Sequence, residues 1–234
     1  MSDIDSVDRL EAILGKTPPA VNLKVIDHVD ESAMRWLAAA PLMFAGFGDA
    51  QGIGITLAGG APGFATAEPA ILAIPLAMLD DPALAVPGAS FGSLFLVPGI
   101  GETLRINGRV AAVADGTARI AVAECYVHCA KALIRSGFWS AAPSDAAPST
   151  PGEFAAAARF MALATIDAAG AADLSPKGDP AGTMAHIAGD QFWFADHVKL
   201  NKDKGLGARI AGAFVSVPGL MQRGLDKDYK DNLY

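Results

Sequence analysis

The chain repeats itself at an offset of about 119 residues, and this repeat is the feature that most restricts its fold. The run Thr56-Leu57-Ala58-Gly59-Gly60-Ala61-Pro62-Gly63 aligns with Ser175-Pro176-Lys177-Gly178-Asp179-Pro180-Ala181-Gly182. A Val-Pro-Gly tripeptide follows in each copy, with Pro98 in the first and Pro218 in the second, at an offset of 120. Two distant landmarks at nearly the same offset indicate an internal duplication. The alternative, in a chain rich in Ala and Gly, is a chance match of small-residue runs.

Each copy opens with an apolar run that predicts a buried strand. These runs are Pro41–Phe47 and Phe160–Ile166, and each is followed by a turn, 48–52 and 167–170. A further strand is expected in each copy, at Ala70–Ile74 and at Gln191–Ala195. The stretch from Ser175 to Gly182 predicts the end of a strand, because its prolines and glycines interrupt a hydrogen-bonded ladder.

The first copy continues where the second does not. Gly101–Val110 predicts a long strand, in which Asn107-Gly108 is either a hairpin turn or a kink. Ala118–Ala123 predicts another strand, and Glu124–Gly137 predicts a helix. A helix over Glu31–Ala40 precedes the first strand, and a short one begins after Asp5-Ser6.

The expected fold class is therefore α+β, mainly antiparallel β, with two fused units. Residues 1–140 form the N-terminal copy, residues 141–152 a linker rich in Pro, Ala and Ser, and residues 153–234 a shortened C-terminal copy.

Composition excludes several classes of function. The net charge of −7 disfavours a general nucleic-acid role, and apolar runs such as Ile71–Leu79 are too short to span a bilayer. The acidic start, Met1–Asp5, is unlike a secretory signal, and two cysteines without such a signal predict reduced thiols in the cytoplasm. Cys125 and Cys129 flank His128, and on a helix they share one face. They are either part of a metal site or a buried apolar pair, and no second cluster supplies further ligands.

Cations gather in the second copy and have no counterpart in the first. Lys177 aligns with Ala58, and Lys199, Lys202 and Lys204 follow the third strand of the second copy. A hydroxyl at Ser175, the Lys177 ammonium and exposed backbone N–H groups at a strand end suit a phosphate. The alternative is a surface turn followed by a solvated helix face.

Several runs together resemble the pyridoxamine-phosphate-oxidase-related flavoproteins, which have an FMN-binding split β-barrel. They are Phe160–Ile166, the Ser175–Pro180 stretch, Leu94-Phe95-Leu96-Val97-Pro98-Gly99-Ile100-Gly101-Glu102-Thr103-Leu104-Arg105-Ile106-Asn107-Gly108-Arg109, and His128–Trp139. The order of the motifs is reversed relative to single-unit members, and the best versions lie in opposite copies. The resemblance thus implies a tandem fusion, an internal pseudo-dimer in which the first copy has lost its phosphate site and one site is shared.

The resemblance also implies a set of cofactor-binding residues. Ser175 and Lys177 are expected near the phosphate or ribityl chain of FMN, and Glu102, Thr103 and Arg105 on the ring side. Trp139 either approaches the isoalloxazine or packs in a core or interface. Four residues, His197, Lys199, Asn201 and Lys202, fall where the family carries an Arg/Asn/Lys cluster, although the usual Arg is missing here.

The expected function is an FMN-dependent oxidoreductase that acts on a small molecule, with its catalytic residues unknown. No metal signature and no compact nucleophile–base set is present in the sequence. The alternative is a non-enzymatic or degenerate module that binds flavin or haem, or is structural only. The expected partner is a small-molecule substrate, and neither nucleic acid nor a membrane is expected. The chain is expected to be either a homodimer or a monomeric pseudo-dimer.

Overall fold

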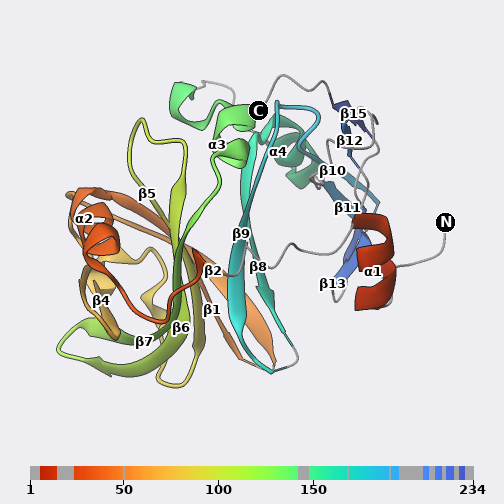
Figure 1. The fold of residues 1–234 in the computed structure, drawn as a ribbon. Helices are drawn as coiled ribbons and strands as arrows, with labels where there is room; N and C mark the ends of the chain where they lie inside the picture. Colours follow the sequence, from red (N-terminus) through yellow and green to blue (C-terminus); the bar gives the residue numbers. More distant parts are fainter. Residues whose placement is uncertain are drawn as a thin grey trace. The chain divides into compact units, whose positions relative to one another are not determined.

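A computed structural model describes residues 6–14, 24–49, 51–141, 148–167, 169–189 and 191–194, with four short stretches, 208–210, 214–217, 220–223 and 227–229. The chain divides into two compact units (Figure 1). Unit 1 comprises residues 1–18, 131–161 and 177–234, and unit 2 comprises residues 19–130 and 162–176. Each unit is described by itself.

Unit 2 contains a seven-stranded antiparallel sheet with the strand order β2-β1-β5-β6-β7-β4-β3. The strands are β1 (Leu42–Asp49), β2 (Gly52–Gly59), β3 (Thr66–Glu68), β4 (Ile71–Pro75), β5 (Ser90–Leu96), β6 (Thr103–Ala114) and β7 (Thr117–His128). Short 3₁₀ turns, η2 (Leu76–Met78) and η3 (Pro82–Leu84), link β4 to β5.

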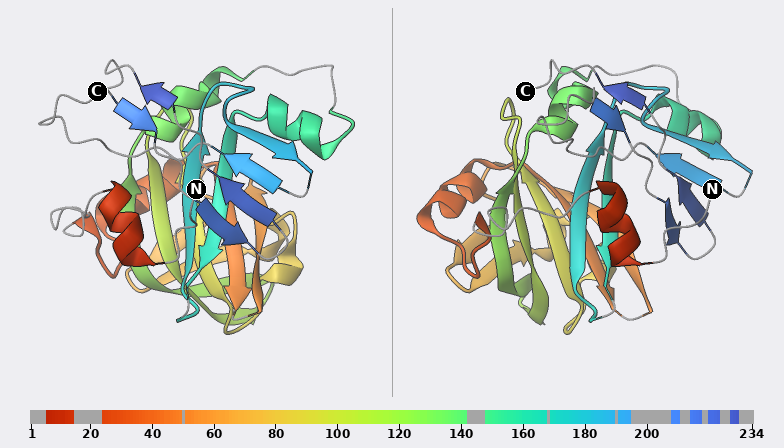
Figure 2. Two further views of the ribbon diagram at one scale, coloured as in Figure 1. Left: turned by 90° about the vertical axis from the view of Figure 1, so that its right-hand side faces the viewer. Right: turned by 45° about the vertical axis from the view of Figure 1, so that its right-hand side comes forward.

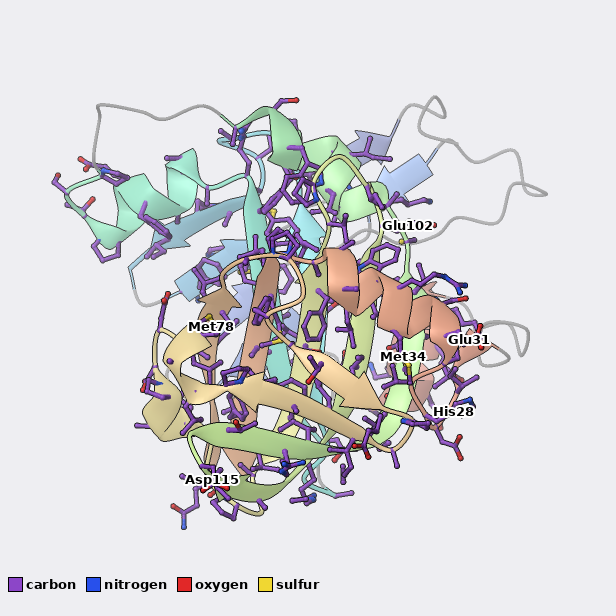
Figure 3. All side chains as sticks on the ribbon, turned by 90° about the vertical axis from the view of Figure 1, so that its left-hand side faces the viewer. His28, Glu31, Met34, Met78, Glu102 and Asp115 are labelled. Carbon is purple, nitrogen blue, oxygen red and sulfur yellow. The ribbon has the colours of Figure 1, made fainter. Side chains whose placement is uncertain are left out.

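The core of unit 2 lies on the face of this sheet that helix α2 (Glu31–Ala39) covers. Asp30 caps α2, because its carboxylate accepts a hydrogen bond from the Ala33 backbone N–H at 2.7 Å. Met34 packs against the core, whereas Glu31 on the same helix is exposed (Figure 3). The largest fully buried side chains of this core are Met43, Leu72, Ile74, Phe91, Phe95, Leu104, Ile106 and Ile120.

A hairpin of β8 (Phe160–Ile166) and β9 (Ala172–Gly178) contributes its residues 162–176 to unit 2. The Ala172 N–H donates to Ser90 Oγ at 2.8 Å. Close approach is possible because β5 has a glycine here: a Cβ on Gly92 would lie 3.2 Å from the Asp173 backbone. As expected, β9 ends inside the Ser175–Gly182 stretch. It nevertheless runs through Pro176, which a two-stranded sheet tolerates because each strand has a free edge.

Unit 1 holds the short helices and the remaining described strands. They are α1 (Val7–Leu14), α3 (Lys131–Ser136), the 3₁₀ turn η4 (Phe138–Ser140), α4 (Pro151–Ala157), β10 (Ala185–Ala188), β11 (Gln191–Phe194), β12 (Ala208–Ile210), β13 (Phe214–Val217), β14 (Leu220–Arg223) and β15 (Lys227–Tyr229). Strands β10, β11, β14 and β13 form a sheet in that order, and α4 packs against β10 (Figure 2). Gly137, at a φ of 57°, ends α3 in the left-handed conformation that favours glycine.

The expected helix over residues 124–137 is wrong in its first half. Strand β7 continues to His128, and the helix occupies only Lys131–Ser136. The strand persists because Glu124, Tyr126 and His128 alternate with a period of two and each faces a residue of β6. Cys125 is therefore a buried strand residue and Cys129 an exposed residue beyond the strand, so they share no helix face.

The other strand and helix expectations are largely confirmed. Asn107-Gly108 lies inside the continuous strand β6 and is not a hairpin turn; the register with β7 shifts here, because Asn107 pairs with Glu124 and Gly108 with Val122. The region expected as a linker, 141–152, overlaps the start of α4, and its residues 142–147 lie outside the described part. Thr150 caps α4 by accepting from the Glu153 N–H at 3.2 Å.

The repeat is visible in the secondary structure of the two copies. Moved 119 positions along the chain, β2, β3 and β4 fall on β9, β10 and β11 respectively. In each copy the last two of these strands pair antiparallel. The described chain is thus mainly antiparallel β with few helices, an α+β protein, and none of its described helices is long and apolar enough to cross a bilayer.

Candidate functional site

One face of strands β6 and β7 is lined with polar side chains. Thr103, Arg105 and Asn107 alternate along β6, and each pairs in register with a residue of β7: His128, Tyr126 and Glu124. Alternation places all six on the same side of the sheet. We call these six residues the polar face.

Arg105 is the centre of the polar face. Its NH1 donates to the Tyr126 hydroxyl at 2.6 Å and to Asp173 Oδ1, on β9, at 2.8 Å. The Arg105 side chain is only 6% exposed, whereas that of Asp173 is 42% exposed. Asn107 Nδ2 donates to Asp173 Oδ1 and to Glu124 Oε2, both at 3.0 Å. A nearly buried cation is thus anchored on one side by a hydrogen-bonded carboxylate.

Several buried polar atoms of this face have no hydrogen-bond partner among the described residues. They are Arg105 Nε and NH2, Thr103 Oγ1, Asn107 Oδ1 and His128 Nδ1. Buried polar groups in proteins are nearly always hydrogen-bonded, and leaving one unsatisfied costs about 1–3 kcal/mol. The cluster therefore has the donor and acceptor capacity to take up water or a polar ligand.

The electrostatics of the polar face keep His128 neutral. Burial, followed by the positive charges of Arg105 and Lys24, lowers the pKa of His128 to about 4. Burial raises the pKa of Tyr126, and the nearby Arg105 opposes that rise. The Tyr126 ring has Lys24 Nζ at 5.1 Å and the Arg105 guanidinium carbon at 5.3 Å from its centroid. At neutral pH this face thus offers a fixed guanidinium, an uncharged phenol and an uncharged imidazole.

The structure brings together some of the residues expected to bind the cofactor. Thr103 and Arg105 lie on the polar face, and Glu102 is an exposed residue just before β6. Ser175 is half-buried on β9 and follows Asp173 by two residues, so both lie on the same face of that strand. Arg109 donates to the Gly170 carbonyl and Arg105 to Asp173, so β9 runs towards the Thr103 end of β6 as it approaches Ser175.

Two further expected residues, Lys177 and Trp139, belong to unit 1. Lys177 Nζ lies 5.9 Å from the centroid of the Phe194 ring. Trp139, 38% exposed, packs edge-on against Phe138 with ring centroids 4.9 Å apart. His197, Lys199, Asn201 and Lys202 lie outside the described residues, so the expected cation cluster stays a prediction.

Within unit 1, hydrogen bonds hold the last residue of β9, Gly178, and the following Asp179. Arg135 Nε, on α3, donates to the Gly178 carbonyl at 2.9 Å and lies 3.7 Å from Asp179 Oδ1, with both side chains almost fully buried. The Asp179 N–H donates to the Arg159 carbonyl at 3.0 Å. The turn that follows Lys177 is therefore fixed by α3 and by the residue before β8.

Sequence reasoning missed Asp173, Tyr126 and His128 as members of the polar face. The signal for Asp173 is its spacing of two residues from Ser175, which places both on one side of a strand. Tyr126 and His128 were missed because residues 124–137 were predicted to be a helix, which does not place them opposite β6. Among the described residues, no group of three or more His, Cys, Asp or Glu side chains is arranged to hold a metal ion.

No protein-family model matches this chain, and comparisons with curated proteins and with solved structures likewise give no match.

Proposed function

We propose that the chain is an FMN-binding flavoprotein that acts as an oxidoreductase on a small molecule. The observation that carries this proposal is the buried Arg105 guanidinium, which has two nitrogens without partners among the described residues beside the unpartnered Thr103 hydroxyl. Both residues belong to the run whose resemblance to the flavoproteins implies contact with the flavin ring.

The chemistry of these donors fits the cofactor. The flavin ring edge carries carbonyl oxygens and ring nitrogens that accept hydrogen bonds, and a guanidinium supplies donors in a fixed planar arrangement. Ser175 and Lys177 offer a hydroxyl and a cation of the kind that binds the FMN phosphate. When bound, FMN supplies hydride and one-electron chemistry. The chain's part is to orient the ring through Arg105, while Asp173 holds that guanidinium in place.

We further propose that the fold is a tandem split β-barrel, an internal pseudo-dimer. The correspondence of β2, β3 and β4 with β9, β10 and β11 at one offset supports this proposal. The polar face lies in the first copy and Ser175 in the second, as complementary loss of site residues requires.

The test is an FMN titration of the purified full-length protein by isothermal calorimetry, with Thr103→Val as the first variant. This substitution removes a buried hydroxyl that has no partner among the described residues, so we expect it to leave the free energy of unfolding unchanged or raised. If Thr103 contacts the flavin, the FMN affinity falls roughly tenfold, the loss typical of one hydrogen bond in a binding site. Lys177→Ala and Lys199→Ala test the phosphate, and Arg119→Ala, an exposed residue of β7, is the matched control.

Several outcomes would refute the proposal. Protein that takes up no FMN and is colourless would favour a structural module, and a haem spectrum would favour haem binding. FMN binding that is unchanged by Lys177→Ala, Lys199→Ala and Thr103→Val would contradict the assigned site. Bleaching of a bound flavin by a reduced nicotinamide would support the oxidoreductase over passive flavin binding.

A further inference from the structure

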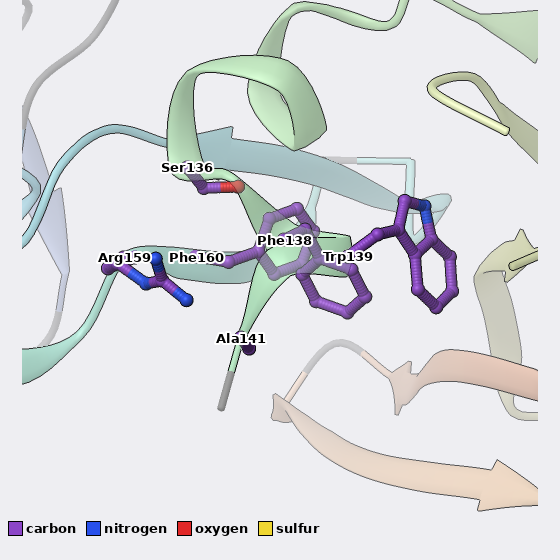
Figure 4. Close-up of a pocket in the computed structure, with 6 residues that line it drawn as sticks. All are labelled: Ser136, Phe138, Trp139, Ala141, Arg159 and Phe160. Carbon is purple, nitrogen blue, oxygen red and sulfur yellow. The ribbon is translucent and has the colours of Figure 1, made fainter. Parts of the chain in front are cut away.

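A pocket of about 450 Å³ lies within unit 1, at the junction of α3, η4 and the start of β8 (Figure 4). Its lining residues are Ser136, Phe138, Trp139, Ala141, Arg159 and Phe160. The volume is within the range of small-molecule sites in proteins, at their smaller end. The polar face of unit 2 contributes no residue to it.

Aromatic rings form one continuous wall of this pocket. Phe138 is the middle ring: its centroid lies 4.8 Å from that of Phe160 and 4.9 Å from that of Trp139. Both pairs have tilted, edge-on geometry, with interplanar angles of 64° and 89°. Rings held in this way present faces and edges to a further aromatic ring, which packs against them in the same offset or edge-on manner.

Arg159 supplies the charge. Its side chain is half-buried, and its guanidinium makes no hydrogen bond or ion pair with any residue that the structure describes. The guanidinium lies over the turn at Gly137, where an added Cβ would be 3.6 Å from NH1. A half-buried guanidinium that lacks a carboxylate partner favours an anion, and its planar fork matches a carboxylate with two parallel hydrogen bonds.

The single positive charge of the pocket favours a carboxylate over a phosphate ester. Arg159 is the one cationic side chain among the six lining residues, and a phosphate ester carries nearly two negative charges at neutral pH. A single guanidinium balances the single charge of a carboxylate. Because three of the other lining residues are aromatic, the ligand that satisfies both features has an aromatic ring and a carboxylate.

We propose that this pocket binds a small aromatic carboxylate. The carboxylate pairs with the Arg159 guanidinium, and the ring packs against Phe138, Phe160 and Trp139. The proposal is argued from these residues of unit 1 alone and does not depend on the proposed function.

The experiment is calorimetric titration of the purified full-length protein with three probes: 2-naphthoate, its neutral analogue 2-naphthamide, and cyclohexanecarboxylate, which has the charge without the aromatic ring. We expect 2-naphthoate to bind roughly tenfold or more tightly than either analogue, since each lacks one of the two interactions. Equal affinity for 2-naphthoate and 2-naphthamide, or no binding of 2-naphthoate, would overturn the proposal.

Variants assign the site. Arg159→Met is expected to reduce the 2-naphthoate affinity roughly tenfold and to leave 2-naphthamide binding unchanged, whereas Trp139→Leu weakens both. Arg119→Met, at an exposed position of β7, is the control and is expected to change neither. If Arg159→Met does not fold, Arg159→Lys replaces it, and an undiminished 2-naphthoate affinity in that variant would contradict the bidentate contact.

A competition arm separates this proposal from the FMN proposal. Titration of 2-naphthoate in the presence of saturating FMN is expected to give the same affinity as without FMN. Displacement of 2-naphthoate by FMN would overturn the proposal, because the pocket would then be the ring site of the flavin. Protein that binds no FMN but binds 2-naphthoate in an Arg159-dependent way would refute the proposed function and support the pocket.

Discussion

The guanidinium of Arg105 lies 2.8 Å from the carboxylate of Asp173, which is 68 residues further along the chain. The pair joins β6 to β9 inside unit 2, and the arginine side is nearly inaccessible to solvent. Because Asp173 also accepts from Asn107 Nδ2 at 3.0 Å, a single carboxylate fixes two side chains of the polar face.

The Arg105–Asp173 pair is expected to contribute to stability. Asp173→Asn removes the charge that balances a buried guanidinium, so the free energy of unfolding should fall by about 1–3 kcal/mol, at the lower end because Asp173 is 42% exposed. Urea unfolding measures the change. The matched control is Asp115→Asn, on an exposed turn with a φ of 50° that asparagine tolerates, and it should have little effect. Equal stability of the Asp173→Asn variant and the wild type would show that the pair contributes nothing net.

Gly178 is expected to tolerate no side chain. A Cβ at this position would collide with the Ala132 carbonyl oxygen of α3. Neither atom can rotate away, because the oxygen belongs to the backbone and the Cβ is bonded directly to it. Gly178→Ala should therefore destabilise the protein by about 1–3 kcal/mol, the usual cost of overpacking. Gly52→Ala, where nothing lies within 4 Å of the added Cβ, is the control. Thermal unfolding followed by circular dichroism compares the two, and a similar melting temperature for both variants would contradict the packing at α3.

His128 is expected to make stability depend on pH. Its pKa is about 4 in the folded chain and near 6.5 when unfolded, so between these values the unfolded state binds the extra proton. Stability should then decrease as the pH falls from about 6.5 to about 4, by at most about 3 kcal/mol, with no further loss from this residue below that range. Urea unfolding at several pH values should show a shallower decrease in His128→Gln. The same decrease in both proteins would mean that another group is responsible.

The two cysteines are expected to differ in reactivity. Burial, with a smaller contribution from the Asp30 carboxylate, raises the pKa of Cys125 to about 11, whereas Cys129 is exposed. Since the thiolate is the reactive form, iodoacetamide at pH 8 should label one thiol per native chain and two after denaturation. Cys129→Ser should abolish labelling of the native protein, as mass spectrometry can measure. Rapid labelling of Cys125 in that variant would contradict its burial.

Local patterns in the sequence were sufficient to predict much of the fold. Strands β1 and β8 are short apolar runs bounded by turn residues, although β8 is half-buried and not the buried strand expected, and α2 starts at a capping aspartate. The prediction that the helix starts at residue 124 was wrong, because the local sequence of residues 124–128 is compatible with both a strand and a helix. The pairing of Tyr126 with Arg105, which decides between them, depends on a partner strand that local periodicity does not reveal.

The candidate site was predicted less completely than the fold. Thr103 and Arg105 were identified through the resemblance, and the structure adds that they share a buried face with His128. Asp173 entered only through tertiary structure, because a lone aspartate on a predicted strand has no distinguishing local pattern. The pocket around Arg159 was likewise not predicted from the sequence. Its lining residues come from two segments, 136–141 and 159–160, which no sequence motif links.

The position of Asp173 late in the chain has a consequence for synthesis on the ribosome. Strands β6 and β7 are translated well before the carboxylate that neutralises Arg105, so the nascent sheet must keep that guanidinium in water until the β8–β9 hairpin emerges. A message that stops before codon 173 would encode a sheet with a permanently uncompensated charge on the surface that the hairpin should seal. Completion of this surface in the nascent chain therefore depends on a segment, residues 162–176, that is translated after the whole seven-stranded sheet.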